Sequence, residues 1–268
     1  MSLNIALWQG PSPEGSDDRA FAALDAALTA AAAMGAVTLV APEVYFPGYN
    51  QPDIPAKAQA RGGPWHQRLA ALARAHGCGI VIGYAERDGA TIYNSAVAFD
   101  ANGQESSHYR KVQLFGPREK SIYAPGDAIS TFDLHGVRTA MLICYDVEFA
   151  PLVRKLAEAG TRLVLVPTAN PEPNTHVSRL VVPAHAINHS VTIAYANYCE
   201  TEGDITYCGA SVIAAPDATI LAAAGPGTTL LVTDIDRAPD PALMQTQLQD
   251  HKPIKEGRHA KRHPRQPL

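Results

Sequence analysis

The sequence has little cysteine, and the few cysteines present are not spaced for a metal site or a redox pair. Four occur in 268 residues, at positions 78, 144, 199 and 208. No pair has C-x-x-C spacing, which argues against zinc ribbons and thioredoxin-like motifs. So few cysteines in a chain of this length also argue against a disulfide scaffold. Cys199 and Cys208 can face each other across a hairpin, but we expect both to be free thiols in or near the core.

Basic charge and long apolar runs are also scarce. The chain has 22 Lys and Arg residues against 26 Asp and Glu residues, a formal net charge of -4 that argues against a nucleic-acid or membrane-surface partner. The most apolar window, residues 22–33, is interrupted by Asp25 and is too short to span a bilayer. No basic stretch followed by a long apolar core marks a signal peptide at the N-terminus. We therefore expect a cytoplasmic protein.

The sequence does contain enough apolar residues for a sizeable core. Hydrophobic residues make up 46% of the chain and charged residues 18%, which suits one large domain or two small ones. Because no shift in composition marks a linker, we expect a single domain over residues 1–268, with a polar C-terminal extension from about 237 to 268. Basic residues cluster between Lys252 and Arg265. In an acidic chain, a solvated or partner-docking terminus explains them better than a nucleic-acid arm.

Strands and helices alternate in both halves of the chain. The expected strands cover residues 3–9, 37–40, 79–86, 91–99, 104–110, 139–144, 162–166, 190–198, 208–214 and 229–235. The expected helices cover residues 19–36, 64–77, 148–159 and 175–189, the last weakened by Pro183. A pattern of strand, helix, strand, helix and then antiparallel hairpins occurs twice. It predicts an α/β protein in which two sheets pack together with helices outside.

Three chemically active side chains lie at the ends of expected strands. Glu43 follows the strand at 37–40, Lys111 follows the strand at 104–110, and Cys144 closes the strand at 139–144. Ligands of open α/β sheets gather at such strand ends, so the three side chains can converge if the sheets pack as expected. A helix N-terminus just after Cys144 would also stabilise its thiolate.

This set of groups suits attack on a carbonyl or nitrile carbon. A thiol with a pKa of about 8.5 is mostly protonated at neutral pH, so a base must take its proton. Glu43 can act as that base, particularly if burial raises its pKa. Lys111 and the backbone N–H of Tyr145 can stabilise the negative charge that develops on the attacked group. One such donor contributes about 3 kcal/mol in other enzymes.

The three residues lie in extended motifs. The motifs are PEVYFPGY at 42–49, YRKVQLFGPREK at 109–120 and LICYDVEF at 142–149, with VPTANP at 166–171 and YAN at 195–197 in support. Together they resemble the motifs of the nitrilase superfamily of carbon–nitrogen hydrolases, and the similarity runs from about residue 3 to 235. The resemblance implies a four-layer αββα sandwich of two mixed β-sheets flanked by helices. It also implies dimer formation across one helical face and no metal or organic cofactor.

The resemblance further implies a role for each residue of the set. Glu43 corresponds to the general base, Lys111 to the transition-state stabiliser and Cys144 to the nucleophile. True nitrilases usually have Trp-Glu after the cysteine, whereas amidase-like branches have Tyr-Asp. This chain has Tyr145-Asp146. We therefore expect hydrolysis of a small carboxamide to the acid and ammonia through a cysteine thioester.

Further candidate residues have a structural interpretation beside the functional one. By resemblance, Glu119 corresponds to a second glutamate that helps position the substrate or the lysine, but it can also pair with Arg118 or Lys120 at the surface. Three more residues can line the pocket or serve packing and turns: Tyr49, Tyr145 and Asn170.

Two histidines on one expected helix raise the possibility of a metal site. His185 and His189 are four residues apart, but the intervening glutamate of H-E-x-x-H and a third ligand are missing, so we interpret them as surface or interface residues.

Several other functions remain open. A nitrile or an N-carbamoyl compound could be the substrate of the same three residues. The chain could also be a catalytically idle binding protein on the same fold. A thiol redox protein would need a resolving cysteine near Cys144, and none is close in sequence.

Overall fold

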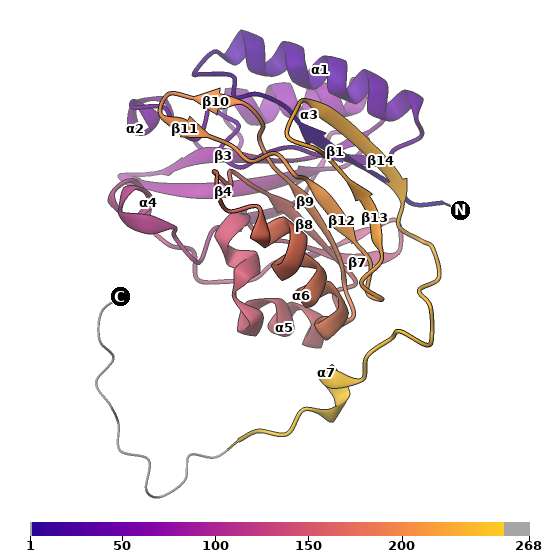
Figure 1. Cartoon of the computed structure of the whole chain (residues 1–268). Helices are drawn as coiled ribbons and strands as arrows, with labels where there is room; N and C mark the ends of the chain where they lie inside the picture. The colour runs from indigo at the N-terminus through magenta and orange to yellow at the C-terminus, as the bar shows by residue number, and fades with distance from the viewer. Residues whose placement is uncertain (1, 255–268) are drawn as a thin grey trace, which may run out of the picture.

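The computed structural model describes residues 2–254, and two six-stranded β-sheets form its centre (Figure 1). The first sheet has the order β14 (Thr229–Asp234), β1 (Asn4–Gln9), β2 (Thr38–Val40), β3 (Gly79–Asp88), β4 (Thr91–Phe99) and β5 (Glu105–Arg110). The second has the order β13 (Ile220–Ala223), β12 (Val212–Ala214), β9 (Thr192–Ala196), β8 (Leu163–Pro167), β7 (Val137–Met141) and β6 (Thr131–Leu134). Strands β1–β2–β3 and β7–β8–β9 are parallel and the other neighbours antiparallel, so both sheets are mixed. A separate hairpin joins β10 (Thr201–Glu202) and β11 (Ile205–Thr206).

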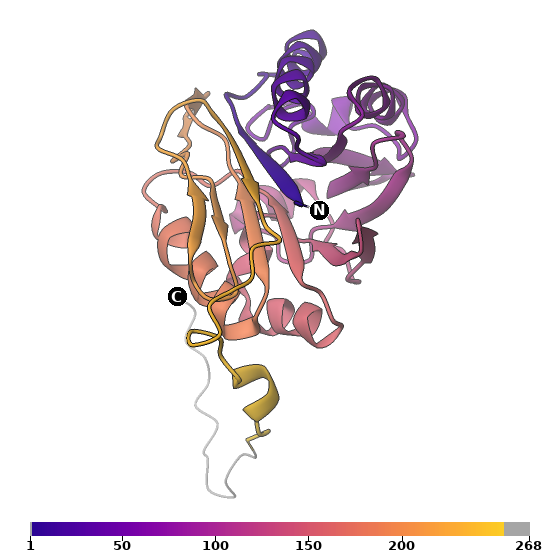
Figure 2. The same cartoon turned by 90° about the vertical axis from the view of Figure 1, so that its right-hand side faces the viewer.

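Helices cover the outer faces of both sheets. α1 (Asp17–Ala33) and α3 (Pro64–His76) pack on the first sheet, and α5 (Ala150–Glu158) and α6 (Val182–His189) pack on the second (Figure 2). The Ser16 side chain caps α1 by accepting a hydrogen bond from the Arg19 N–H at 3.3 Å. The remaining helices are short: α2 (Ile54–Lys57), α4 (Gly116–Ile122) and α7 (Gln247–Asp250). These layers confirm the expected αββα sandwich.

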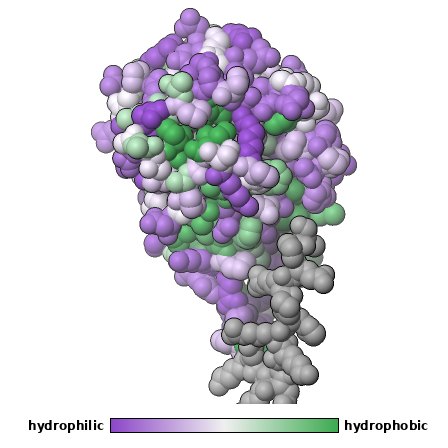
Figure 3. Space-filling model, turned by 90° about the vertical axis from the view of Figure 1, so that its left-hand side faces the viewer, coloured by the Kyte–Doolittle hydropathy of each residue, from purple (hydrophilic) through white to green (hydrophobic). Residues whose placement is uncertain are grey.

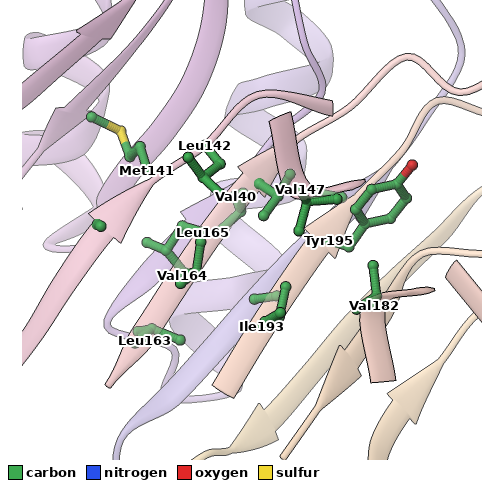
Figure 4. Packing of buried hydrophobic residues seen from close by; sticks show 14 of the residues in the cluster. Val40, Met141, Leu142, Val147, Leu163, Val164, Leu165, Val182, Ile193 and Tyr195 are labelled. Carbon is green, nitrogen blue, oxygen red and sulfur yellow. The ribbon is translucent and has the colours of Figure 1, made fainter. Parts of the chain in front are cut away.

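The two sheets pack face to face through apolar side chains of their central strands. Val40 of β2 lies in the same buried cluster as Leu165 of β8 and Ile193 of β9, and all three are fully buried (Figure 4). Burying one such side chain contributes about 1.5–3 kcal/mol. Because this core fixes the central strands, it also fixes the loops that follow β2 and β8. Those loops carry part of the candidate site.

The segment around Cys144 differs from the expected strand and helix. β7 ends at Met141, and residues Cys144–Glu148 form a 3₁₀ turn, η1, before α5 begins at Ala150. The backbone N–H of Ile143 is bonded to the Asp146 side chain at 3.1 Å, so it does not extend a sheet ladder. The strand therefore stops short of Cys144, and α5 does not begin directly after the sulfur.

Two other expected elements are shorter or divided. The expected helix at 175–189 consists of a π-helical turn, η2 (Val177–Val181), followed by α6. Pro183 lies in the first turn of α6, where its missing N–H is tolerated. The expected strand at 208–214 is reduced to β12 because Gly209 and Ala210 both have positive φ. Seven short elements were not expected from the sequence: α2, α4, α7, β6, β10, β11 and β13.

The C-terminal part of the chain returns to the first sheet before leaving it. β14 pairs with β1, and the chain then runs past Asp234 to α7, which contacts α6 (Figure 1). The basic cluster expected between Lys252 and Arg265 lies largely outside the described residues.

The described helices and one face of the surface can be compared by their hydropathy. The side shown in Figure 3 is mostly hydrophilic, with hydrophobic residues gathered near its middle. Within residues 2–254, no helix is long and apolar enough to span a membrane.

Candidate active site

The loops after β2 and β5 bring a buried lysine and two carboxylates together. Lys111 Nζ lies 2.6 Å from Glu43 Oε1 and 2.8 Å from Glu119 Oε1. All three side chains are almost completely excluded from solvent. The charges of Glu43 and Lys111 also act on the Cys144 thiol, so the three residues at strand ends share one site.

A glycine on β3 allows the Glu43 loop to lie against the sheet. Gly83 accepts a hydrogen bond from the Tyr45 N–H at 2.8 Å and donates one to the Pro42 carbonyl at 3.0 Å. A Cβ atom at Gly83 would lie 2.6 Å from the Glu43 Cα, closer than packed atoms approach. The Glu43 N–H also donates to the Thr168 carbonyl in the loop after β8, at 3.3 Å. The backbone of Glu43 is thus held by both sheets.

The Glu43 carboxylate has one occupied and one free oxygen. Oε1 accepts hydrogen bonds from Lys111 Nζ and from Asn94 Nδ2, the latter at 2.7 Å. Oε2 is buried and has no hydrogen-bond partner among the described residues. Burial raises the pKa of Glu43 to about 7, although Lys111 and Asn94 act to lower it. A carboxylate with one free oxygen and a pKa near neutrality is suited to accept and return a proton.

Lys111 remains a cation despite its burial. Burial alone lowers its pKa, but the negative charges of Glu43 and Glu119 outweigh that effect and hold the pKa well above its usual value. Backbone hydrogen bonds fix its position: its N–H donates to the Asn94 carbonyl at 2.8 Å, and its carbonyl accepts from the Gly126 N–H at 2.7 Å. The site therefore contains a positioned ammonium group.

Glu119 belongs to the buried cluster and not to the surface. Its Oε1 accepts a hydrogen bond from the Tyr49 hydroxyl at 2.7 Å in addition to that from Lys111, and its Oε2 accepts from the Phe115 N–H at 2.8 Å. Arg118 donates instead to two backbone carbonyls of the loop that carries Tyr49. The alternative of a surface pair between Glu119 and Arg118 is therefore wrong.

Cys144 begins η1 in a left-handed backbone conformation, with φ of 45°, and is partly accessible. Burial and the charge of Glu43 raise the pKa of its thiol well above the usual value, although Lys111 and the Ala169 N–H act to lower it. The resting sulfur is thus protonated. The expectation that a following helix N-terminus stabilises a thiolate is wrong, because α5 starts too late. The Tyr145 N–H lies in the first turn of η1, where helical geometry provides no acceptor.

Asp146 links the turn that carries Cys144 to β5 and to the loop after it, which carries Lys111. Its carboxylate accepts three hydrogen bonds, from the Ile143 N–H at 3.1 Å, the Tyr109 hydroxyl at 2.8 Å and the Gln113 N–H at 2.7 Å. The side chain is fully buried, and burial raises its pKa to about 6.

Sequence reasoning missed the structural roles of two polar residues at the site. It used Asp146 only to distinguish amidases from nitrilases, and it did not single out Asn94. A signal for Asn94 was present, because asparagine is uncommon in the interior of a strand such as β4.

A small cavity of about 70 Å³ opens beside the cysteine. Its lining comprises Phe115, Cys144, Tyr145, Glu148, Ala169, Asn170, Pro171, Asn174, His176 and Val177. The Tyr145 ring packs edge-on against Phe115 and Phe149, with centroids 5.2 and 4.9 Å away. Asn170 is fixed by its N–H, which donates to Asn197 Oδ1 at 2.7 Å. Tyr49 is not among the lining residues and instead supports Glu119.

The two histidines that raised the possibility of a metal site lie close together but do not form one with other described residues. The His185 and His189 rings lie 5.3 Å apart, and His189 Nδ1 is 3.0 Å from the His185 carbonyl oxygen. Within the described residues, no group of three or more His, Cys, Asp or Glu side chains is arranged to hold a metal ion.

Comparison with known proteins places these residues in a family. The model of the carbon-nitrogen hydrolase family matches residues 4–239. The chain is 44% identical over 204 residues to a protein described as "Hydrolase in pqqF 5'region" from Pseudomonas protegens, with 74% of this chain and 71% of that protein covered. It is 31% identical over 200 residues to an (R)-stereoselective amidase from a Pseudomonas species, with 74% and 72% covered.

The structure also resembles that of an amidase from Nesterenkonia sp. AN1. For a variant that carries acrylamide added at its active-site cysteine, the TM-score is 0.85 and the identity 33%, with 93% of this chain and 96% of that chain covered. Another variant of that amidase was solved in complex with butyramide. These matches confirm the resemblance to the nitrilase superfamily and to its amidase-like branch. The chain belongs to the carbon-nitrogen hydrolase family.

Proposed function

We propose that the protein is an amidase that hydrolyses a small carboxamide to the carboxylic acid and ammonia. The observation that carries this proposal is the buried, unpartnered Oε2 of Glu43, in a site that also holds a protonated thiol and an ammonium group. Amide hydrolysis needs each of these: a base, a nucleophile and a donor for the developing oxyanion.

The first half of the reaction forms a thioester. Glu43 Oε2 takes the Cys144 proton while the sulfur attacks the amide carbon, and the C–S bond forms. Because the thiol pKa lies above that of Glu43, the proton moves as the bond forms and not before it. Lys111 Nζ and the Tyr145 N–H donate to the oxyanion. Glu43 then gives its proton to the nitrogen, the C–N bond breaks and ammonia leaves.

The second half of the reaction restores the enzyme. Glu43 takes a proton from water as the water oxygen attacks the thioester carbon. The C–S bond breaks, the acid leaves and the sulfur regains a proton. Glu119 keeps Lys111 in place throughout, because it accepts a hydrogen bond from Nζ in addition to that of Glu43 and is itself held by Tyr49.

The size of the cavity favours short amides. A volume of about 70 Å³ is well below the roughly 150 Å³ of an engineered cavity that binds benzene. The similar amidase from Nesterenkonia sp. AN1 was solved with butyramide and with a product of acrylamide addition. We therefore infer an acyl group of about the size found in those two amides. Asn170 helps to shape the cavity wall.

A substrate panel tests this function. Ammonia release from propionamide, butyramide, butyronitrile and an N-carbamoyl amine is measured with the native protein and with Cys144→Ala. We expect turnover of the two amides by the native protein alone. Preferred turnover of the nitrile, or release of carbon dioxide with ammonia from the carbamoyl compound, would replace the amidase assignment by one of the other two activities.

We also infer the setting in which the enzyme works. The family resemblance favours a homodimer formed across one helical face, which light scattering of the full chain can test. All four cysteines are free thiols, in keeping with a reducing compartment such as the cytoplasm. We further propose that residues 1–268 form one carbon-nitrogen hydrolase domain whose polar extension begins near residue 237.

A further inference from the structure

Glu148 adds a carboxylate to the cavity beside Cys144, and the reaction described above does not use it. It is the last residue of η1 and lines the same cavity as the nucleophile. A 3₁₀ turn rises about 2 Å per residue, so the Cα atoms of the two residues are roughly 8 Å apart along its axis. That separation suits the acyl chain of a short amide whose carbonyl carbon is at the sulfur.

The Glu148 side chain is half-buried and has no partner in the described part of the chain. No hydrogen bond contributes to its environment, and burial raises its pKa. Asp146, two residues earlier, has three donors on its carboxylate. Since an unpaired carboxylate in a partly desolvated site is unfavourable, Glu148 lacks the partner that a ligand can supply.

The other groups of the site offset the negative charge of Glu148 only in part: burial raises its pKa, and His176 and Lys111 act to lower it without cancelling that effect. Lys111 is the nearest fixed cation of the catalytic cluster, but it is already bound by Glu43 and Glu119. No lysine or arginine is among the described residues that line the cavity, and His176 is the one imidazole there. A negatively charged acyl chain would therefore meet a like charge, with no lysine or arginine in the described cavity lining to pair with it.

We propose that Glu148 forms a cation-accepting subsite, and that the substrate is a short amide with an ammonium group on its acyl chain. This inference rests on the amidase function proposed above. The ammonium group would pair with the Glu148 carboxylate while the amide carbon lies at the Cys144 sulfur.

Three amides of similar length but different charge test the proposal. They are 3-aminopropanamide, butyramide and malonamate, which are cationic, neutral and anionic. kcat/KM is measured for each at pH 8, where imidazoles are ordinarily neutral. The native protein is compared with Glu148→Gln. Asp18→Asn serves as the control, because it removes an exposed carboxylate on α1, outside the cavity.

We expect the native protein to prefer 3-aminopropanamide to malonamate by at least about tenfold, since like charges in a partly desolvated site repel strongly. Glu148→Gln should reduce that preference by about tenfold. A urea unfolding midpoint equal to that of the native protein shows that the variant is folded. Asp18→Asn should leave the preference unchanged.

The possible failures can be told apart. Equal turnover of the three amides, or an unchanged preference in Glu148→Gln, would overturn the subsite while the amidase function stands. Hydrolysis of none of the three, with turnover of nitriles or carbamoyl compounds only, would overturn the amidase function and the substrate proposal with it.

Discussion

Replacement of Asp146 by asparagine should weaken both the fold and the catalytic reaction, because this carboxylate joins the turn that carries Cys144 to the segment that carries Lys111. Its two oxygens accept three hydrogen bonds, of which two are buried and the one from Gln113 is partly buried. The asparagine oxygen can keep the two hydrogen bonds that Oδ2 accepts, from the Tyr109 hydroxyl and the Ile143 N–H. The amide NH₂ group would then face the Gln113 N–H, so that two donors would meet. Leaving one buried donor unsatisfied costs about 1–3 kcal/mol. Asp146→Ala would leave three donors unsatisfied, which should reduce the free energy of unfolding by at least about 3 kcal/mol. The free energy of unfolding of a native protein is typically about 5–15 kcal/mol.

Urea unfolding and steady-state kinetics measure the two effects of Asp146→Asn. The unfolding midpoint should fall at constant slope, which indicates lost stability without a change in the denatured state. kcat should fall by about tenfold or more, because a misplacement of about 1 Å can reduce rates by about a hundredfold.

A second aspartate provides the control for this prediction. Asp133→Asn changes an exposed residue that accepts one hydrogen bond from the Gly136 N–H, and asparagine can accept the same bond. It should leave both measurements unchanged. If Asp146→Asn behaved in the same way, the argument that Asp146 positions the catalytic turn would be wrong.

Three further predictions concern the base and its surroundings. Glu43 must be ionised to accept a proton and its pKa is raised to about 7, so kcat/KM should fall as pH decreases through about 7. Asn94→Ala removes a hydrogen bond that stabilises the ionised carboxylate, so it should shift this acidic limb of the pH profile to higher pH. An unchanged acidic limb would argue against Glu43 as the base. Gly83→Ala should reduce kcat by at least about tenfold, because its Cβ would displace Glu43, and native activity would contradict this contact. Lys111→Met should abolish turnover and destabilise the protein by about 3–5 kcal/mol in urea unfolding, because it leaves two buried carboxylates without their cation.

The positions of the site residues at strand ends can be predicted from the sequence, but their contacts with other segments cannot. Short apolar runs locate β2 and β8, and the motif residues that follow β2 and β5 indicate where Glu43 and Lys111 lie. The contact between Asn94 and Glu43 depends on packing between segments far apart in the chain. Local patterns contain no information about that contact.

The chemistry of Cys144 was also beyond local patterns. Sequence reasoning expected a helix directly after the sulfur that would help to stabilise a thiolate. In the structure the Asp146 side chain takes the Ile143 N–H and forms a tight 3₁₀ turn instead. The depth of burial and the charge of Glu43 then raise the pKa. Both causes come from tertiary packing.

The fate of the acyl group tests the central claim most directly. In a mechanism with a thioester on Cys144, added hydroxylamine competes with water for the same intermediate and forms a hydroxamate. We predict an identical ratio of hydroxamate to acid from propionamide and from methyl propionate, because both would give the same propionyl-enzyme. We also predict no hydroxamate from Cys144→Ala. A ratio that depends on the leaving group, or hydroxamate formation by Cys144→Ala, would contradict the mechanism.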